Sequence, residues 1–220
     1  VKTSSLCLRD CYLRVKRRYS YNRDIGGVYV IFEFEYYIHA ADASAQHDIK
    51  QDQINGQVLN DVGPAIQWEA IARIATYVGR SVEFDSLQQG ADALWAISTS
   101  FGPHTPAQWL ELTRHMVKPV AEGSERVRLH YDPAIAVPIA AATPESVAQG
   151  EALLWHVFDA ITPQTLLLRG AQSDLLSVAT AQQMTLRGPR ARLVEFADIG
   201  HAPTLIAADQ VAVVRRFLLE

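Results

Sequence analysis

The chain has 220 residues, of which 49% are hydrophobic and 20% are charged, and its formal net charge is −4. This length suits one domain with a sizeable core, or a domain that carries an inserted subdomain. The small negative charge offers no basic surface for a nucleic acid or an acidic membrane, so we exclude polyanions as partners.

The apolar runs and the cysteines indicate the cellular compartment of the protein. The longest apolar runs, residues 28–32 and 135–142, are much shorter than the roughly 20 residues of a membrane helix, and the N-terminus lacks the apolar core of a signal peptide. The two cysteines, Cys7 and Cys11, fit neither a disulfide framework nor a common zinc site. We therefore expect a soluble cytoplasmic protein with no membrane association, no metal and no cofactor.

Residue usage changes near residue 57. None of the 10 prolines and none of the 4 tryptophans precedes it, whereas 6 of the 8 tyrosines and both cysteines do. Before the change, the alternating stretch VYVIFEFEYYI (28–38) predicts a strand or a bent pair of strands. The polar residues that follow predict a surface helix or loop with a turn at Asn55-Gly56. We therefore treat residues 1–56 as a separate segment.

From residue 57 the chain is more regular. GQVLNDVGPA begins as a short apolar strand and leaves it at Gly63-Pro64, so we expect a sheet strand over residues 57–64. Residues 65–158 place apolar side chains at helical spacing, with a plausible N-cap at Thr105 and a stop signal at Gly79. All four tryptophans lie in this helical stretch, where packing between helices is the simpler interpretation and an apolar substrate pocket is the alternative.

The last third alternates strands and helices. QTLLLRG and ARLVEF read as strands, the first of the continuously apolar kind that is buried on both faces. VATAQQMTLRG and AADQVAVVRRFLLE read as the helices that follow them. This order predicts an α/β fold with a parallel sheet and helices packed outside it.

Two polar side chains follow these strands. Asp174 lies four residues beyond Gly170, and His201 lies five residues beyond Phe196. Ligands of open parallel sheets bind at the carboxyl ends of the strands, so an acid and an imidazole could meet there, with the carboxylate fixing the ring's tautomer. The alternatives are ordinary ones: Asp174 or Ser177 could cap the helix that begins near Val178, and His201 could be a surface residue.

The two loops, GAQSDLL and DIGHAP, together with the VLNDVGP segment resemble the α/β-hydrolase fold superfamily from about residue 57 to residue 220. The resemblance implies a partial α/β-hydrolase fold, with an unassigned segment at 1–56, a sheet strand at 57–64, a helical cap or lid at 65–158 and the C-terminal part of the core at 159–220. It also implies that Asp174 is the acid and His201 the general base of a catalytic triad.

The nucleophile of that family is not recognisable in the sequence. The family places it in a Gly-x-Ser-x-Gly turn between a strand and a helix, and the chain has no such pentapeptide. The nearest match, NRDIGG, resembles the Asp turn of dehalogenase and epoxide-hydrolase relatives, with Asp24 as nucleophile, but the residues after it read as a strand. The loop that would stabilise the oxyanion is likewise not recognisable, and its closest match is His39-Ala40.

The expected parent activity is hydrolysis of an apolar, ester-like small molecule or a related acyl or carbon–carbon bond, in a truncated chain. One alternative is a catalytically inactive remnant or an interaction module, because the nucleophile is missing. Another is a hydrolase that uses Asp24. The apolar QTLLLRG strand would normally have a partner strand on each side. If one edge of the sheet is exposed, two chains could pair through it and form a homodimer.

Overall fold

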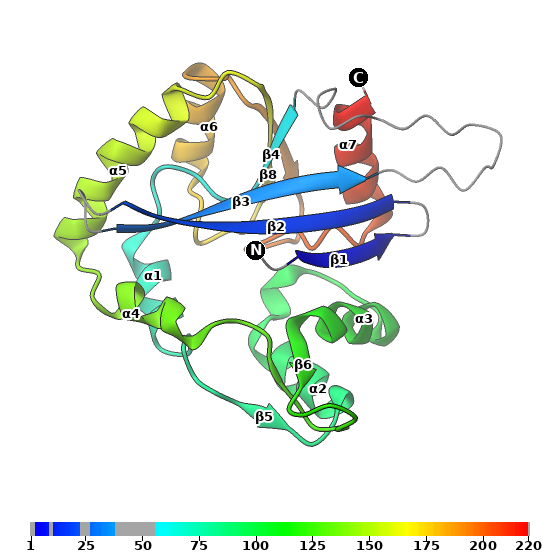
Figure 1. The fold of residues 1–220 in the computed structure, drawn as a ribbon. Coiled ribbons are helices and arrows are strands. Elements are labelled where there is room, and N and C mark those ends of the chain that lie inside the picture. Colours follow the sequence, from blue (N-terminus) through cyan, green and yellow to red (C-terminus); the bar gives the residue numbers. More distant parts are fainter. Residues whose placement is uncertain (1–2, 9–10, 23–26, 38–55, 220) are drawn as a thin grey trace. The chain divides into compact units, whose positions relative to one another are not determined.

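A computed structural model describes residues 3–8, 11–22, 27–37 and 56–219 (Figure 1). The chain divides into two compact units, residues 1–57 and residues 58–220. The division falls where residue usage changes, so the boundary predicted near residue 57 is also a boundary between units.

The N-terminal unit is a three-stranded antiparallel sheet in the order β1-β2-β3. Its strands are β1 (Thr3–Leu8), β2 (Cys11–Asn22) and β3 (Gly27–Tyr37). Strand β3 confirms the strand predicted from VYVIFEFEYYI, as one strand and not a bent pair. The polar stretch predicted to be a helix or loop lies outside the described residues.

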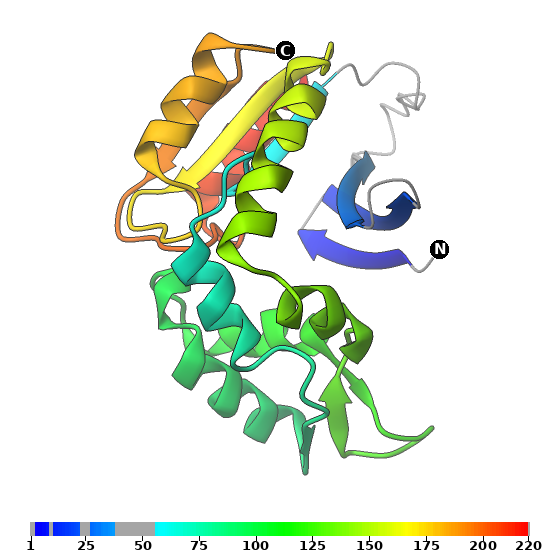
Figure 2. The same ribbon diagram turned by 90° about the vertical axis from the view of Figure 1, so that its left-hand side faces the viewer.

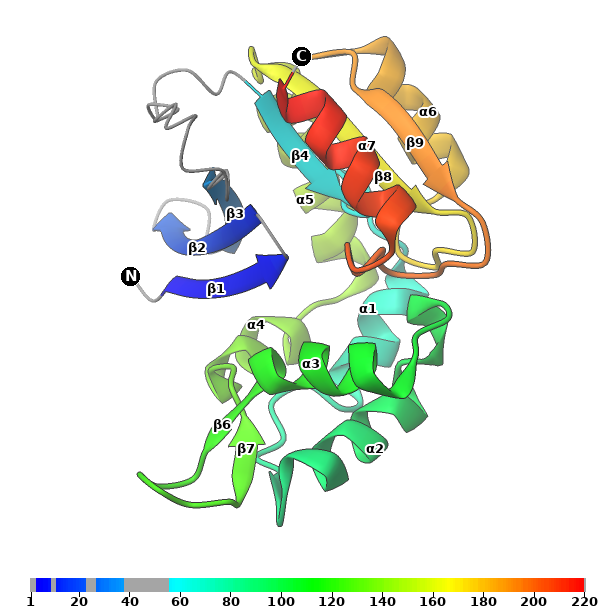
Figure 3. The ribbon, with the colours of Figure 1, turned by 90° about the vertical axis from the view of Figure 1, so that its right-hand side faces the viewer.

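The second unit is built on a three-stranded sheet in the order β4-β8-β9. Its strands are β4 (Gly56–Asn60), β8 (Gln164–Gly170) and β9 (Arg192–Phe196). Strands β8 and β9 pair in parallel, from Leu166 opposite Arg192 to Gly170 opposite Phe196. Figure 3 shows β4 running in the same direction, so the predicted parallel sheet is confirmed.

Helices cover both faces of this sheet. Figures 2 and 3 show α5 (Pro144–Asp159) and α6 (Val178–Leu186) on one face and α7 (Ala208–Leu219) on the other. Strand β8 is central, and Leu166, Leu167 and Leu168 are almost completely buried. Since successive side chains of a strand point to opposite faces, only a strand covered on both sides can carry three leucines in a row.

The main core lies between β8 and the α5–α6 face. Leu167 packs there with a cluster drawn from α5, α6 and their loops: Trp155, Phe158, Leu176, Ala181, Met184 and Ala191. Helix α5 falls within the predicted cap, yet Trp155 and Phe158 bury it against the large sheet. The helix therefore packs as part of the core of this unit.

An ion pair joins the C-terminal ends of α5 and α6. The Arg187 guanidinium binds the Asp159 carboxylate through Nε and Oδ1 at 2.8 Å and lies 4.4 Å from the centre of the Trp155 ring. This hydrogen bond from Arg187 holds the pKa of Asp159 below its ordinary value. The contact covers the outer edge of the core cluster.

The stretch predicted to be a cap, residues 65–158 (below, the cap region or cap), is largely helical, as the sequence predicts. Its main helices are α1 (Trp68–Ala75), α2 (Leu87–Ile97) and α3 (Pro106–Met116), with a short α4 (Ala136–Ala140). Thr105 caps α3 as predicted, because its hydroxyl accepts from the Gln108 N–H while the Gln108 side chain accepts from Thr105 N. None of the described helices is long and apolar enough to cross a membrane.

The cap also contains a small antiparallel sheet that the sequence did not predict. Its strands are β5 (Glu83–Phe84), β7 (Val127–Leu129) and β6 (Val117–Pro119), in that order. Two or three residues are too few to show a period of two, so pattern analysis has nothing to detect. Phe84, Val117 and Val127 form a second buried cluster that holds these short strands together.

We expect truncation of Leu167 to unfold the second unit more readily. Leu167→Ala removes a fully buried side chain at the centre of the main cluster and should lower the free energy of unfolding by about 2–5 kcal/mol. The matched control is Leu186→Ala, because Leu186 is 76% exposed and its loss should cost about 0.5 kcal/mol or less. Urea unfolding followed by tryptophan fluorescence measures both, and equal midpoints for the two variants would contradict this core.

Candidate functional site

The carboxyl ends of the three parallel strands meet at one edge of the sheet. Asp61 directly follows β4, Ser173 lies in the turn after β8, and His201 lies in the loop after β9. This is the edge at which open parallel sheets bind their ligands. We therefore take these three side chains as the candidate site.

His201 binds Asp61. The ring Nδ1 lies 2.8 Å from Asp61 Oδ2, and the two residues are 140 positions apart in the chain. A carboxylate can only accept, so this contact places the proton on Nδ1 and leaves the lone pair on Nε2. The imidazole is 29% exposed, whereas Asp61 is completely buried. The buried Asp61 carboxylate thus holds the ring by Nδ1 and leaves Nε2 free to accept a proton.

The turn after β8 supplies the other donors to Asp61. The Gly170 N–H donates to Oδ1 at 3.1 Å, and the Ser173 hydroxyl donates to Oδ2 at 2.5 Å. The Asp61 N–H donates in turn to Leu168 O at 2.8 Å, which continues the pairing of β4 with β8 by one residue. A buried carboxylate needs such partners, because an unpaired charge in the interior is very costly.

Asp61 has a left-handed backbone, with φ of 54°. Asp and Asn adopt this region more easily than most residues, although it remains less favourable than a helical or extended backbone. Three hydrogen bonds to its carboxylate, from Gly170, Ser173 and His201, hold the residue in this conformation. The conformation and the contacts therefore support each other.

The Ser173 hydroxyl connects Asp61 to the backbone of its own turn. The N–H groups of Leu175 and Leu176 donate to Ser173 Oγ at 3.2 and 3.1 Å. With both N–H groups pointing at the oxygen, the hydroxyl proton is directed at Asp61 Oδ2. Ser173 therefore orients the same oxygen that binds His201.

Two glycines let the strand-end loops approach each other. A Cβ on Gly170 would lie 2.1 Å from Gly200 O, and a Cβ on Gly200 would lie 2.9 Å from the Ser100 Cβ. The Gly200 N–H donates to Ser100 O at 2.6 Å, which ties the His201 loop to the cap. Both positions therefore exclude a side chain because of close backbone packing.

Asn60 holds the far side of the same loop. Its Nδ2 donates to Pro203 O at 2.9 Å, two residues beyond His201. Asn60 and Asp61 are consecutive at the end of β4, and they bind two points of one loop. This pairing fixes both the ring of His201 and the path of the chain after it.

The structure corrects the predicted contact between Asp174 and His201. Asp174 lies on the surface and binds Arg73, with Arg73 Nη2 2.6 Å and Nε 3.0 Å from Oδ2. The imidazole binds Asp61 instead. The reason is the turn geometry, in which Ser173 faces the strand ends while its neighbour Asp174 faces solvent. Ser177 caps α6, the alternative considered for this loop.

Sequence analysis missed Asp61 although its signal was present. The segment VLNDVGP was identified as a strand and its exit, and Asp61 is the first residue after that strand. The rule that drew attention to the residues after β8 and β9 applies equally to β4. Applied to all three strands, it would have given two candidate acids, Asp61 and Asp174.

The sequence also suggested a nucleophile and an oxyanion loop. Asp24 and His39 fall outside the described residues, and the element after Asp24 is strand β3, whereas a nucleophile turn leads into a helix. Within residues 56–219, no group of three or more His, Cys, Asp or Glu residues could hold a metal ion.

Comparison with known proteins points to one family. Over 162 residues the chain is 46% identical to the 3-hydroxybutyrate-oligomer hydrolase of Cupriavidus necator, a match that covers 73% of this chain and 55% of that protein. No protein-family model matches the sequence.

Solved structures give the same result. An α/β hydrolase from Novosphingobium aromaticivorans is 32% identical with a TM-score of 0.59, over 77% of this chain and 58% of its own. A Rickettsia typhi protein assigned as a hydrolase is 25% identical with a TM-score of 0.61, over 75% of this chain and 53% of its own. The chain thus spans little more than half the length of the relatives that it matches.

Removal of the Ser173 hydroxyl should destabilise the second unit. Ser173→Ala leaves two N–H groups without their acceptor and removes one of the two donors to Asp61 Oδ2, which should cost about 1–3 kcal/mol. Thr76→Ala is the control, because the Thr76 hydroxyl makes one exposed hydrogen bond, to Arg73 O, and its loss should cost about 0.5 kcal/mol or less. Urea unfolding compares the two, and Ser173→Ala with wild-type stability would contradict the contact.

Proposed function

Because the chain belongs to the α/β-hydrolase fold superfamily, we propose that residues 56–219 form the acid–base part of an ester hydrolase. The observation that carries this proposal is the 2.8 Å contact of His201 Nδ1 with the buried Asp61 carboxylate. In hydrolases of this kind an imidazole takes the proton of the nucleophile, and a carboxylate fixes the tautomer and stabilises the imidazolium that forms.

We assign the base to His201 and the orienting acid to Asp61. His201 Nε2 would accept the nucleophile's proton and later return it to the leaving alcohol. The acid role goes to Asp61 in place of Asp174, because Asp61 binds the ring and Asp174 binds Arg73. The nucleophile is not assigned to any residue. The helices of the cap would cover the substrate.

The substrate class follows from the relative. The Cupriavidus necator protein is a 3-hydroxybutyrate-oligomer hydrolase. We propose that this chain takes short linear esters of hydroxy acids, whose neutral backbone of ester groups is compatible with the chain's net charge of −4. Since the chain spans little more than half of that relative, the proposal concerns the acid–base and cap parts of such an enzyme.

Two alternatives keep their own support. An inactive remnant or interaction module fits a chain in which no nucleophile turn is recognisable, and association through the β4 edge of the sheet stays a prediction. A hydrolase that uses Asp24 would form an ester on that carboxylate, which mass spectrometry of the trapped protein detects. Labelling of a serine by a fluorophosphonate would exclude both alternatives.

The same substitution, Asp→Asn, made at Asp61 and at Asp174 distinguishes the two candidate acids. We expect Asp61→Asn to lower kcat/KM for the 3-hydroxybutyrate trimer and for p-nitrophenyl butyrate on the order of 10³–10⁴-fold, because the amide favours the wrong tautomer of His201. Asp174→Asn should change kcat/KM less than about twofold, since it removes only an exposed ion pair. His201→Ala should match Asp61→Asn.

Each other pattern of activity has its own meaning. Loss of activity in Asp174→Asn with retention in Asp61→Asn would overturn the acid assignment. Hydrolysis that survives in His201→Ala would show that the ring is not the base. A wild-type chain that hydrolyses neither ester and takes no fluorophosphonate would favour the inactive remnant.

A further inference from the structure

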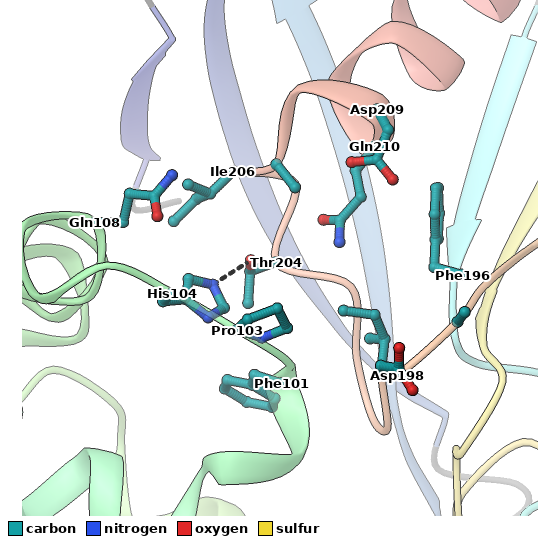
Figure 4. A pocket seen from close by; sticks show the side chains of 13 residues that line it. Phe101, Pro103, His104, Gln108, Phe196, Asp198, Thr204, Ile206, Asp209 and Gln210 are labelled. Carbon is teal, nitrogen blue, oxygen red and sulfur yellow. Dashed lines mark hydrogen bonds between the residues drawn. The ribbon is translucent and has the colours of Figure 1, made fainter.

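A cavity of about 190 Å³ lies behind the loop that carries His201. One wall is formed by the segment around η2 (Thr99–Phe101) and the start of α3. The other is formed by residues 196–199 together with Thr204, Ile206, Ala207, Asp209 and Gln210. His201 itself is not among the lining residues, although the lining continues on both sides of it (Figure 4). The cavity is thus separate from the exposed side of the imidazole.

Gln210 gives this cavity a hydrogen-bond donor. Its side chain is only 3% exposed, and its Oε1 accepts from the Leu205 N–H at 2.8 Å. Because a backbone N–H can only donate, the amide oxygen must face Leu205 and the nitrogen must face away. Figure 4 shows this Nε2 directed into the cavity, and no described residue accepts from it. The donor is therefore available to a molecule in the cavity.

The remaining lining defines the chemistry of an occupant. Phe101, Phe196 and Ile206 offer apolar contacts. The two carboxylates in the lining, Asp198 and Asp209, disfavour an anion by like-charge repulsion.

His104 is already satisfied. Its Nε2 lies 2.8 Å from Thr204 Oγ1 and its Nδ1 lies 2.9 Å from Gly102 O. Gln210 Nε2 is therefore a donor of this lining that remains available to an occupant.

We propose that the cavity is a binding site for a small neutral molecule with an apolar body and one hydrogen-bond acceptor, such as an amide or ketone oxygen, which binds Gln210 Nε2. A molecule of liquid water occupies about 30 Å³. If each non-hydrogen atom of a ligand takes about that volume, the cavity of about 190 Å³ accommodates a ligand of roughly six non-hydrogen atoms. The site is independent of the hydrolase proposal, because its lining includes neither Asp61 nor His201.

Occupancy of this site should act on His201. Asp198 and Leu205, which stand on either side of the His201 segment, have left-handed backbones with φ of 57° and 59°. This conformation is unfavourable for non-glycine residues and persists only where neighbouring contacts hold it. Asp198 and Thr204 line the cavity on the two sides of His201 in the chain, and Gln210 also accepts from Leu205 N, so an occupant lies beside residues from both ends of the loop.

A pair of isosteric probes tests the site. Butyramide is neutral and carries an amide oxygen, whereas butyrate has the same size and an anionic head. Titration of the isotope-labelled full chain, followed by NMR, should show saturable shifts of the Gln210 side-chain NH2 and the Ile206 methyl groups with butyramide. A ligand of about six non-hydrogen atoms should bind with a Kd on the order of millimolar. Butyrate should bind at least about tenfold more weakly.

Two variants test separately the Gln210 donor and the volume of the cavity. Gln210→Glu keeps an oxygen for Leu205 N and removes the donor, and Ala207→Leu fills the cavity without altering Gln210. Each should weaken butyramide binding at least about fivefold, whereas Gln182→Glu on the exposed face of α6 should leave it unchanged. Gln210→Glu places a carboxylate in a buried position, so Ala207→Leu keeps the test decisive if that variant does not fold.

The outcomes are distinct. Equal affinity for butyramide and butyrate, no saturable shift, or full binding in Ala207→Leu would overturn the site. The His201 ring signals should shift with the same midpoint as those of Gln210. Ring signals that do not move while Gln210 saturates would overturn the coupling to His201.

Discussion

The second unit is organised around one buried carboxylate. Asp61 leaves the sheet at the end of β4 and accepts hydrogen bonds from Gly170 and Ser173 after β8 and from His201 after β9. A buried charge is tolerated only where several donors surround it, so the ends of all three strands must stay in register for Asp61 to remain paired. The constraint on the sheet and the constraint on the candidate site are therefore the same. The close approach of Gly170 and Gly200 follows from it.

The loop after β9 is held from two sides. Toward the strand ends, Asn60 and Asp61 bind Pro203 and His201. Toward the cap, Ser100 O accepts from the backbone N–H of Gly200. The loop is thus hydrogen-bonded to both parts of the unit, and a change at Ser100 would be transmitted to the residue next to His201 only through the backbone of Gly200. A cavity on the far side of this loop is well placed to influence the imidazole, since its walls come from the cap and from the loop itself.

The sequence predicted the layers of this unit better than its site. The three adjacent buried leucines in β8 and the N-cap at Thr105 are local signals, and the sequence predicted each correctly because neighbouring residues determine it. The partner of His201 is a non-local property. Asp61 and Asp174 both follow strands, and the choice between them depends on which residue of the Gly170–Leu176 turn faces the sheet, a detail that spacing does not encode. The three short strands β5, β6 and β7 could not be predicted for a different reason: they are stabilised by packing between distant residues, and each is too short to show an alternating pattern.

The central claim, that Asp61 and not Asp174 orients the imidazole, is tested most directly by the tautomer of His201. Long-range 1H–15N correlation spectra of the 15N-histidine-labelled chain distinguish a proton on Nδ1 from one on Nε2, and the measurement needs neither a substrate nor a nucleophile. We predict the Nδ1–H tautomer in the wild type and in Asp174→Asn, and its loss in Asp61→Asn, whose amide can offer a donor to the ring. An unchanged His201 tautomer in Asp61→Asn, together with a change in Asp174→Asn, would contradict the account.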